Sequence, residues 1–109
     1  MKKVVGLLVL LVFVQQLATA QKNEITWYSF EEAIQKTAEK PKMVLVDVYT
    51  DWCGWCKKMD RNTFTDSKVI EYVNENFYAV KLNAEDRKRK FEFKGKEYTE
   101  QMMAYNMRV

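Results

Sequence analysis

Residues 44–58 read V-L-V-D-V-Y-T-D-W-C-G-W-C-K-K, and this stretch decides the fold of the chain. It begins as a nearly continuous apolar run that contains one carboxylate, Asp47, and it leads into Cys53-Gly54-Trp55-Cys56. Those two cysteines are the only ones in the protein. Two thiols separated by two residues, placed where a buried strand gives way to a helix, are typical of a dithiol redox site.

The spacing of the cysteines predicts a role for each. We expect Cys53 at the N-terminus of a helix, where unpaired backbone N–H groups and the helix dipole favour a thiolate. Cys56 follows one turn later and can attack a mixed disulfide formed at Cys53, which makes Cys53 the nucleophile and Cys56 the resolving thiol. Gly54 allows a partner's backbone to approach closely. Trp52 and Trp55 offer flat apolar surface for contact with a substrate.

Asp47 stands in the middle of an apolar run, where burying a carboxylate is costly without a partner. It lies six residues before Cys53, so it could accept the proton of Cys56 during exchange, directly or through water. Lys81 is the one charge in a later apolar run, residues 78–83, and we expect it to lie beside Asp47 and balance its charge. The alternative is that the strand turns Asp47 towards solvent.

Other uses of two cysteines fit this sequence less well. A structural zinc site usually needs four ligands, and the chain has two cysteines and no histidine. Covalent haem attachment requires a histidine after the second cysteine, where Lys57 stands. The lack of histidine also excludes Cys–His hydrolysis. We therefore expect no metal and no cofactor, while an inert disulfide or unused thiols remain an alternative.

Residues 1–20 have the pattern of a secretory signal peptide. Lys2 and Lys3 form a positive region, residues 4–14 an apolar region, and Ala18-Thr19-Ala20 a small-residue cleavage site. The apolar region is roughly half the ~20 residues that a membrane-spanning helix needs, so a permanent anchor is the weaker alternative. We expect a mature domain of residues 21–109 in the periplasm or otherwise exported, with no stable membrane insertion after cleavage.

The composition of the mature chain favours a redox role for the cysteines over nucleic-acid binding or a purely structural disulfide. Loss of Lys2 and Lys3 with the signal peptide brings the net charge from +3 close to neutrality, which gives no argument for nucleic-acid binding. The basic run at residues 87–90 is expected to be a solvated loop. Small exported domains often rely on several disulfides, whereas one closely spaced pair closes too small a ring to constrain the unfolded chain much.

A capping box opens the first predicted helix. The Ser29 hydroxyl and the Glu32 carboxylate can each accept a backbone N–H of the first turn, and Pro41 prevents the helix from continuing. A short strand is expected at residues 25–27. Residues 42–49 read as a strand whose lack of alternation predicts burial on both faces, as in a parallel sheet.

Further elements are predicted after the cysteines. The cysteine helix should end near residues 61–62, and Thr65 or Asp66 should cap a second helix. Its inner face is predicted to contain Val69, Ile70, Tyr72 and Val73. After the strand at 78–83, residues 91–98 around Gly95 allow either a small hairpin or an irregular excursion. Thr99 then caps a last helix, with candidates for its buried side at Met102, Met103 and Met107. Alternating elements of this kind predict a layered α/β domain with a parallel crossover.

The central stretch resembles that of the thioredoxin-fold family. Its V-D-V-Y-T-D-W-C-G-W-C-K is similar to the family's apolar strand with a buried Asp that leads to W-C-x-x-C-K. The resemblance implies that Cys53, Cys56 and Asp47 are nucleophile, resolving thiol and buried proton acceptor. The segment A-V-K-L-N resembles the following strand of the family, whose lysine lies near the buried Asp, and this implies the same place for Lys81.

A closer resemblance covers nearly all of the mature chain. W-C-G-W-C-K-K-M-D-R-N-T-F followed by V-I-E-Y-V-N-E-N-F is similar to an exported bacterial thioredoxin-like group, related to the C-terminal domain of the transmembrane thiol reductant relay. Two departures stand out. Trp55 replaces the proline that typical thioredoxins carry between the cysteines, so their redox potential cannot be carried over. The family's cis-proline loop and the β-hairpin and last helix that follow it have no counterpart before Val109.

The resemblance therefore implies a truncated thioredoxin-like domain, comprising the parallel βαβ half with flanking helices. Its expected activity is thiol–disulfide exchange between the Cys53–Cys56 pair and exported protein substrates, with a membrane or exported thiol reductant as partner. Reduction or isomerisation is expected rather than strong oxidation, because the strongest oxidants of the family carry a histidine between the cysteines. The alternative is a non-catalytic thioredoxin-like binding domain, or an incomplete fragment with idle thiols.

Overall fold

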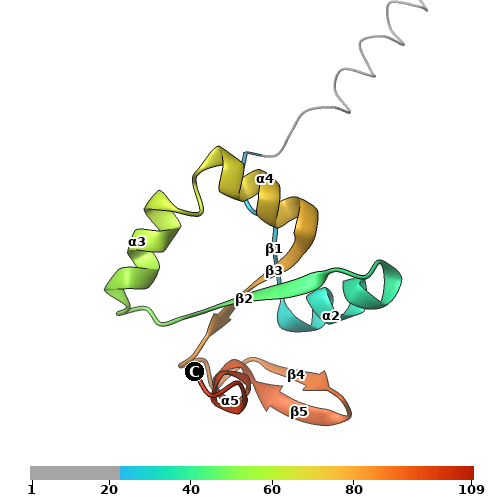
Figure 1. Ribbon diagram of the computed structural model, residues 1–109. Helices are drawn as coiled ribbons and strands as arrows, with labels where there is room; N and C mark the ends of the chain where they lie inside the picture. The colour runs from blue at the N-terminus through green and yellow to red at the C-terminus, as the bar shows by residue number, and fades with distance from the viewer. Residues whose placement is uncertain (1–22) are drawn as a thin grey trace, which may run out of the picture.

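The computed structural model describes residues 23–109, so the predicted signal peptide lies outside the described residues. Strands and helices alternate as predicted, and the result is a mixed α/β domain with a parallel sheet (Figure 1). In chain order the elements are β1 (Trp27–Tyr28), α2 (Phe30–Glu39), β2 (Met43–Tyr49), α3 (Gly54–Asn62), α4 (Ser67–Asn76), β3 (Phe77–Asn83), β4 (Lys90–Phe93), β5 (Lys96–Thr99) and α5 (Glu100–Asn106).

Local capping sets the starts of three helices, as the sequence predicts. Ser29 and Glu32 form both halves of the capping box of α2. Asp66 caps α4 by accepting the N–H groups of its first turn, and Thr99 does the same for α5. An N-cap of this type typically stabilises a helix by about 1 kcal/mol.

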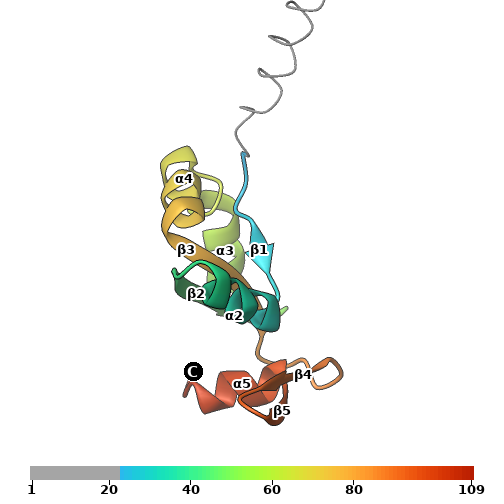
Figure 2. The ribbon, with the colours of Figure 1, turned by 90° about the vertical axis from the view of Figure 1, so that its right-hand side faces the viewer.

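The three-stranded sheet has the order β1-β3-β2, and both pairings are parallel. Alternate side chains of the central strand β3 point to opposite faces. Tyr78, Val80 and Leu82 join a core with α2, the β4–β5 hairpin and α5, while Ala79 joins a second core with Ile70 and Val73 of α4. The sheet therefore has an α2/α5 face and an α4 face (Figure 2).

The prediction that residues 42–49 are buried on both faces is met only in part: Val44, Val46 and Val48 pack against the core on one face and Leu45 against the core on the other, but none of them is fully buried. Strand β2 lies at the edge of the sheet and is half-buried, with Met43 exposed. The most buried strand is β3, where Val80 and Leu82 have no exposed surface. An apolar run predicts that a strand belongs to a sheet, but it does not predict whether the strand lies at the centre or at the edge of that sheet.

Residues 91–98 form a hairpin rather than an irregular excursion. Lys94 and Gly95, with φ values of 51° and 75°, make the turn between β4 and β5, and glycine adopts this left-handed conformation without a steric penalty. Phe91 and Phe93 place the hairpin against Phe30 of α2, with ring centroids 5.4 Å and 5.2 Å apart. Figure 1 shows the hairpin and α5 together on one side of the sheet, where they pack against β3.

The buried faces of α4 and α5 contain fewer residues than the helical spacing of apolar side chains predicts. In α5, Met103 is buried, but Met102 and Met107 are exposed. In α4, Ile70 and Val73 are buried, but Tyr72 is 61% exposed. Helical spacing places these side chains near one face, and the width of the surface opposite decides which are covered. None of the helices within residues 23–109 combines the length and apolar character needed to cross a membrane.

Candidate active site

Cys53 and Cys56 form a disulfide, with their Cα atoms 5.3 Å apart. Cys53 is the N-cap of α3, as predicted, and Cys56 lies within the first turn. The Sγ atom of Cys53 accepts the backbone N–H of Cys56 at 3.2 Å. A helix N-terminus stabilises negative charge at this sulfur, so the geometry favours the thiolate of Cys53 when the bond is reduced.

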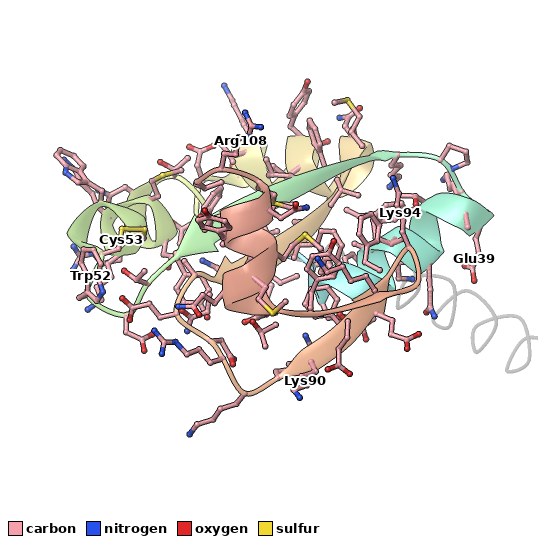
Figure 3. All side chains as sticks on the ribbon, turned by 90° about the horizontal axis from the view of Figure 1, so that it is seen from below. Glu39, Trp52, Cys53, Lys90, Lys94 and Arg108 are labelled. Carbon is pink, nitrogen blue, oxygen red and sulfur yellow. A yellow bond between two sulfur atoms is a disulfide. The ribbon has the colours of Figure 1, made fainter. Side chains whose placement is uncertain are left out.

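The disulfide lies where β2 ends and α3 begins. The N–H of Cys53 donates to the carbonyl of Thr50 at 3.3 Å, which turns the chain from the strand into the helix. Figure 3 shows the disulfide beside Trp52, at the end of the molecule away from Glu39. The same carboxyl end of the sheet holds the other predicted site residues, in agreement with the general location of sites in open parallel sheets.

Asp47 and Lys81 meet across the sheet. They are register partners on β2 and β3, and the Lys81 Nζ atom lies 3.0 Å from Asp47 Oδ2. The side chain of Asp47 is 13% exposed, so the alternative in which it faces solvent is wrong. Both side chains lie on the α4 face of the sheet, because their strand neighbour Ala79 belongs to the core on that face.

Asp60 also belongs to the site, although it is not among the residues predicted from the sequence. Its Oδ1 atom lies 2.6 Å from Lys81 Nζ, closer than the carboxylate of Asp47. Asp60 follows Cys56 by four residues on α3, so both side chains lie on one face of that helix. The sequence does offer one indication of this position. Asp60 stands one helical turn after Cys56, so its carboxylate is expected on the helix face that carries the Cys56 sulfur.

Lys81 connects the strand carboxylate to the cysteine helix. Partial burial alone would lower the pKa of the Lys81 ammonium, but the hydrogen bonds and charges of Asp60 and Asp47 outweigh it and raise that pKa. The ammonium also lies over the rings of Trp27 and Tyr49, at 4.8 Å and 5.4 Å from their centroids. These contacts favour the charged form and fix its position.

The two tryptophans beside the cysteines are exposed. Trp52 is 74% exposed, and its indole N–H donates to Glu85 Oε1 at 2.5 Å. Trp55 is 76% exposed, and Lys58 Nζ lies 5.0 Å from the centroid of its ring. A side chain at Gly54 would meet no atom within 4 Å, so the fold itself does not require glycine there. Apolar surface of this extent next to a reactive bond is suited to contact with another molecule.

The described residues contain no cluster of three or more His, Cys, Asp or Glu side chains arranged to hold a metal ion. Separately, the groups that the site brings together are its two sulfurs, the carboxylates of Asp47 and Asp60, and the ammonium of Lys81. These groups can break and form a disulfide and can move a proton.

Comparison with known families gives one match over most of the chain. Residues 13–103 match the family model described as "Thioredox_DsbH: Protein of unknown function, DUF255". A solved structure named "DsbH Oxidoreductase" has a TM-score of 0.56 and 16% sequence identity, and the alignment covers 87% of this chain and 72% of that one. At this identity the likeness shows the fold, which is thioredoxin-like.

Curated relatives match shorter segments. An uncharacterized protein of Caenorhabditis elegans is 33% identical over 66 residues, which are 60% of this chain and 9% of that protein. Spermatogenesis-associated protein 20 of Rattus norvegicus is 30% identical over 66 residues, 60% of this chain and 8% of the relative. The thiol:disulfide interchange protein DsbD of Haemophilus ducreyi is 48% identical over 46 residues, 41% of this chain and 8% of the relative. The chain thus spans less than a tenth of the length of these relatives.

Proposed function

The chain belongs to the Thioredox_DsbH family, and from this premise we propose that it is a thiol–disulfide oxidoreductase that exchanges its Cys53–Cys56 pair with exported protein substrates. A thiol–disulfide redox function is the class that the family and the paired cysteines support. The observation that carries the proposal is the disulfide at the N-terminus of α3, with the exposed Trp52 and Trp55 next to its cysteines in the chain. We propose reduction or isomerisation as the direction, in a protein-disulfide reductase or isomerase type of enzyme.

The reaction begins from the reduced pair. The thiolate of Cys53 attacks one sulfur of the substrate disulfide, which breaks that bond, forms a mixed disulfide and releases one substrate sulfur as a thiolate that takes up a proton. The Cys56 thiol then loses its proton and attacks the Cys53 sulfur. This step releases the second substrate sulfur and leaves the Cys53–Cys56 disulfide. Two electrons pass from the protein to the substrate, and a dithiol reductant must restore the pair.

We assign the proton of Cys56 to the carboxylate of Asp47, directly or through water. Lys81 holds that carboxylate at 3.0 Å and shares its charge with Asp60, so the three groups form one electrostatic unit between the strand and the cysteine helix. In this role Lys81 and Asp60 position the proton acceptor.

Substrate contact is assigned to the surface around the disulfide. Trp52 and Trp55 would cover apolar side chains of the substrate, and Gly54 would leave room for its backbone. The partner that supplies electrons is proposed to be a membrane or exported thiol reductant, in keeping with the relationship to proteins named thiol:disulfide interchange protein DsbD. Residues 1–20 are proposed to be a cleaved export signal, which would place the domain in the periplasm or otherwise outside the cytoplasm.

The test is an insulin-reduction assay and a scrambled-substrate assay with the purified protein. We expect activity with the native chain and at least about a hundredfold loss in Cys53→Ser, because the variant has no nucleophile. Equal rates in both proteins would contradict the assignment. The alternative of a binding domain with idle thiols predicts instead an ordinary thiol at Cys53, with a pKa near the free value of about 8.5 by thiolate absorbance.

A further inference from the structure

The charges that directly flank the Cys53–Cys56 segment in the sequence differ in sign on its two sides. Asp51 precedes Trp52 on the side of the β2 end, and both residues are exposed. Lys57 and Lys58 follow Cys56 on the helix side, and both are exposed as well. The local sequence therefore places negative charge before the disulfide and positive charge after it.

The acidic side gains a second carboxylate from a distant part of the chain. Glu85 lies in the turn after β3, and its Oε1 atom accepts the indole N–H of Trp52. That turn is fixed in two ways. The N–H of Glu85 donates to Asn83 Oδ1 at 3.0 Å, and the N–H of Ala84 donates to the carbonyl of Tyr49 at 2.9 Å. The carboxylate is thus held beside Trp52 by defined contacts.

The basic side is fixed by a contact within α3. Lys58 follows Trp55 by three residues, a spacing at which helical side chains are neighbours, and its Nζ atom lies over the indole ring at 5.0 Å from the centroid. Each tryptophan beside the disulfide therefore contacts one charged side chain: Trp52 contacts the carboxylate of Glu85, and Trp55 contacts the ammonium of Lys58.

We propose that these charges select the substrate, so that the protein prefers disulfide-bearing segments in one charge order, the order that places a basic side chain beside Asp51 and Glu85 and an acidic side chain beside Lys57 and Lys58. The acidic flank of the site is formed by Asp51 and Glu85, and the basic flank by Lys57 and Lys58. The inference rests on the proposed function, because it names the substrate class of that same site. A substrate with the charges in the reverse order meets like charges on both flanks, which disfavours its approach.

The experiment uses two short peptides, each present as a symmetric disulfide-linked dimer. They have the same composition, but one has lysine before and glutamate after the cysteine, and the other has the reverse order. A third peptide carries glutamine at both positions. Reduced full-length protein is mixed with each dimer, and the rate of peptide reduction is followed by chromatography. The measured quantity is the ratio of the rates for the two charged isomers.

We expect this ratio to differ from one by at least about threefold, since exposed charge contacts change an equilibrium or rate by about 1.5- to fivefold each. Two variants should bring the ratio towards one. Glu85→Gln removes the charge and keeps an oxygen acceptor for Trp52, and Lys58→Met removes the charge and keeps an apolar chain over Trp55. Salt at about 0.5 M should also reduce the ratio, because it screens exposed charges.

Glu92→Gln is the matched control, because it removes one exposed carboxylate from β4 in the hairpin, and its isomer ratio should equal that of the native protein. An isomer ratio of one in the native protein, together with reduction of the glutamine peptide, overturns the inference and leaves the proposed function standing. A ratio that both variants leave unchanged also overturns it. Failure to reduce any of the three peptides overturns the proposed function itself.

Discussion

Helices α3 and α4 follow one another in the chain and have 9 and 10 residues, yet they are held in different ways. Helix α4 buries Ile70 and Val73 against β3. Helix α3 buries no residue within the described part of the chain, and its Met59 is 45% exposed. Helix α4 is therefore held by its apolar face, whereas α3 is held by contacts at its two ends and by the ion pair of Asp60 with Lys81.

The attachments of α3 are few and specific. Its N-terminus is joined to β2 through the Cys53 cap, its last turn is closed by N–H groups that donate to the carbonyl of Met59 at 2.9 Å, and Asp60 is paired with Lys81. Elements with few buried apolar contacts lie at the low end of local stability. The comparison teaches that the helix carrying the disulfide is exposed enough to meet a protein substrate, while α4 supports the sheet beneath it.

The largest expected effect tests whether packing holds α4 and not α3. Ile70→Ala should lower the free energy of unfolding by about 2–4 kcal/mol, because it leaves a cavity in the core. Met59→Ala on α3 should lower it by about 0.5 kcal/mol or less, because its side chain is already exposed. Urea denaturation of both variants measures the difference. Similar losses in the two would show that α3 is packed like α4.

A second prediction concerns reduction of the disulfide. Because the bond lies at the start of α3, its reduction should increase amide hydrogen exchange in residues 54–62 by about tenfold, while exchange in α4 should change less than twofold. Mass spectrometry of the oxidised and reduced protein gives both values. The double variant Cys53→Ser/Cys56→Ser serves as a control that reductant cannot affect. An equal increase of amide exchange in α3 and α4 would contradict the view that the two helices are held in different ways.

The third prediction sharpens the part played by charge. Lys81→Met should cost about 0.5–1 kcal/mol of stability near neutral pH, because it removes a partly exposed cation from two carboxylates. The pKa of Lys81 is raised in the folded state, so the stabilisation is fully present below pH 10.5 and is lost as the pH rises through the raised value. Urea titrations between neutral and strongly alkaline pH should show native and variant stabilities converging. A constant difference would mean that Lys81 acts by packing alone.

The smallest expected effect lies away from both helices, at Glu100 of α5, and serves as a baseline for them. Burial raises the pKa of its carboxyl, although the N–H of Asn83 opposes this. The folded state therefore binds the proton more tightly, and the favourable contribution present below pH 4.5 is lost as the pH rises through the raised value. Glu100→Gln should raise Tm at pH 7 by about 1–2 °C relative to the native protein, with little difference at pH 4. A change of the opposite sign at pH 7 would contradict this reading.

The sequence predicts well what depends on neighbouring residues. Ser29, Asp66 and Thr99 cap their helices because a side-chain oxygen reaches a backbone N–H two or three residues away, which the sequence specifies directly. The cysteine pair at the start of a helix follows in the same way. The pairing of Asp47 with Lys81 was also anticipated, since each is the lone charge of an apolar run and parallel strands can bring the two together.

Prediction failed where the outcome depends on packing between distant elements. The edge position of β2 follows from β3 lying between β1 and β2, and no pattern within residues 42–49 records it. Tyr72 and Met102 have the helical spacing of buried residues, but both are exposed, because spacing along a helix does not record which neighbouring elements cover it. Asp60 does not stand out in the sequence, because it lies on a polar helix among Lys57, Lys58 and Arg61 and not, like Asp47, as the lone charge of an apolar run. The roles of the cysteines and of Asp47 in exchange stay predictions until the assays are done.

Within residues 23–109, β2 lies at the sheet edge, and this position has a consequence for how the described domain behaves in concentrated solution. An edge strand offers its free backbone groups to other chains, and an apolar one is a template for aggregation. Met43–Tyr49 contains a single charged residue, Asp47, and a charge in such a segment acts as a gatekeeper against self-association. We therefore expect Asp47 to affect solubility in addition to its proposed role in proton transfer. Experiments that neutralise it should monitor light scattering alongside activity, so that a loss of soluble protein is not taken for a loss of chemistry.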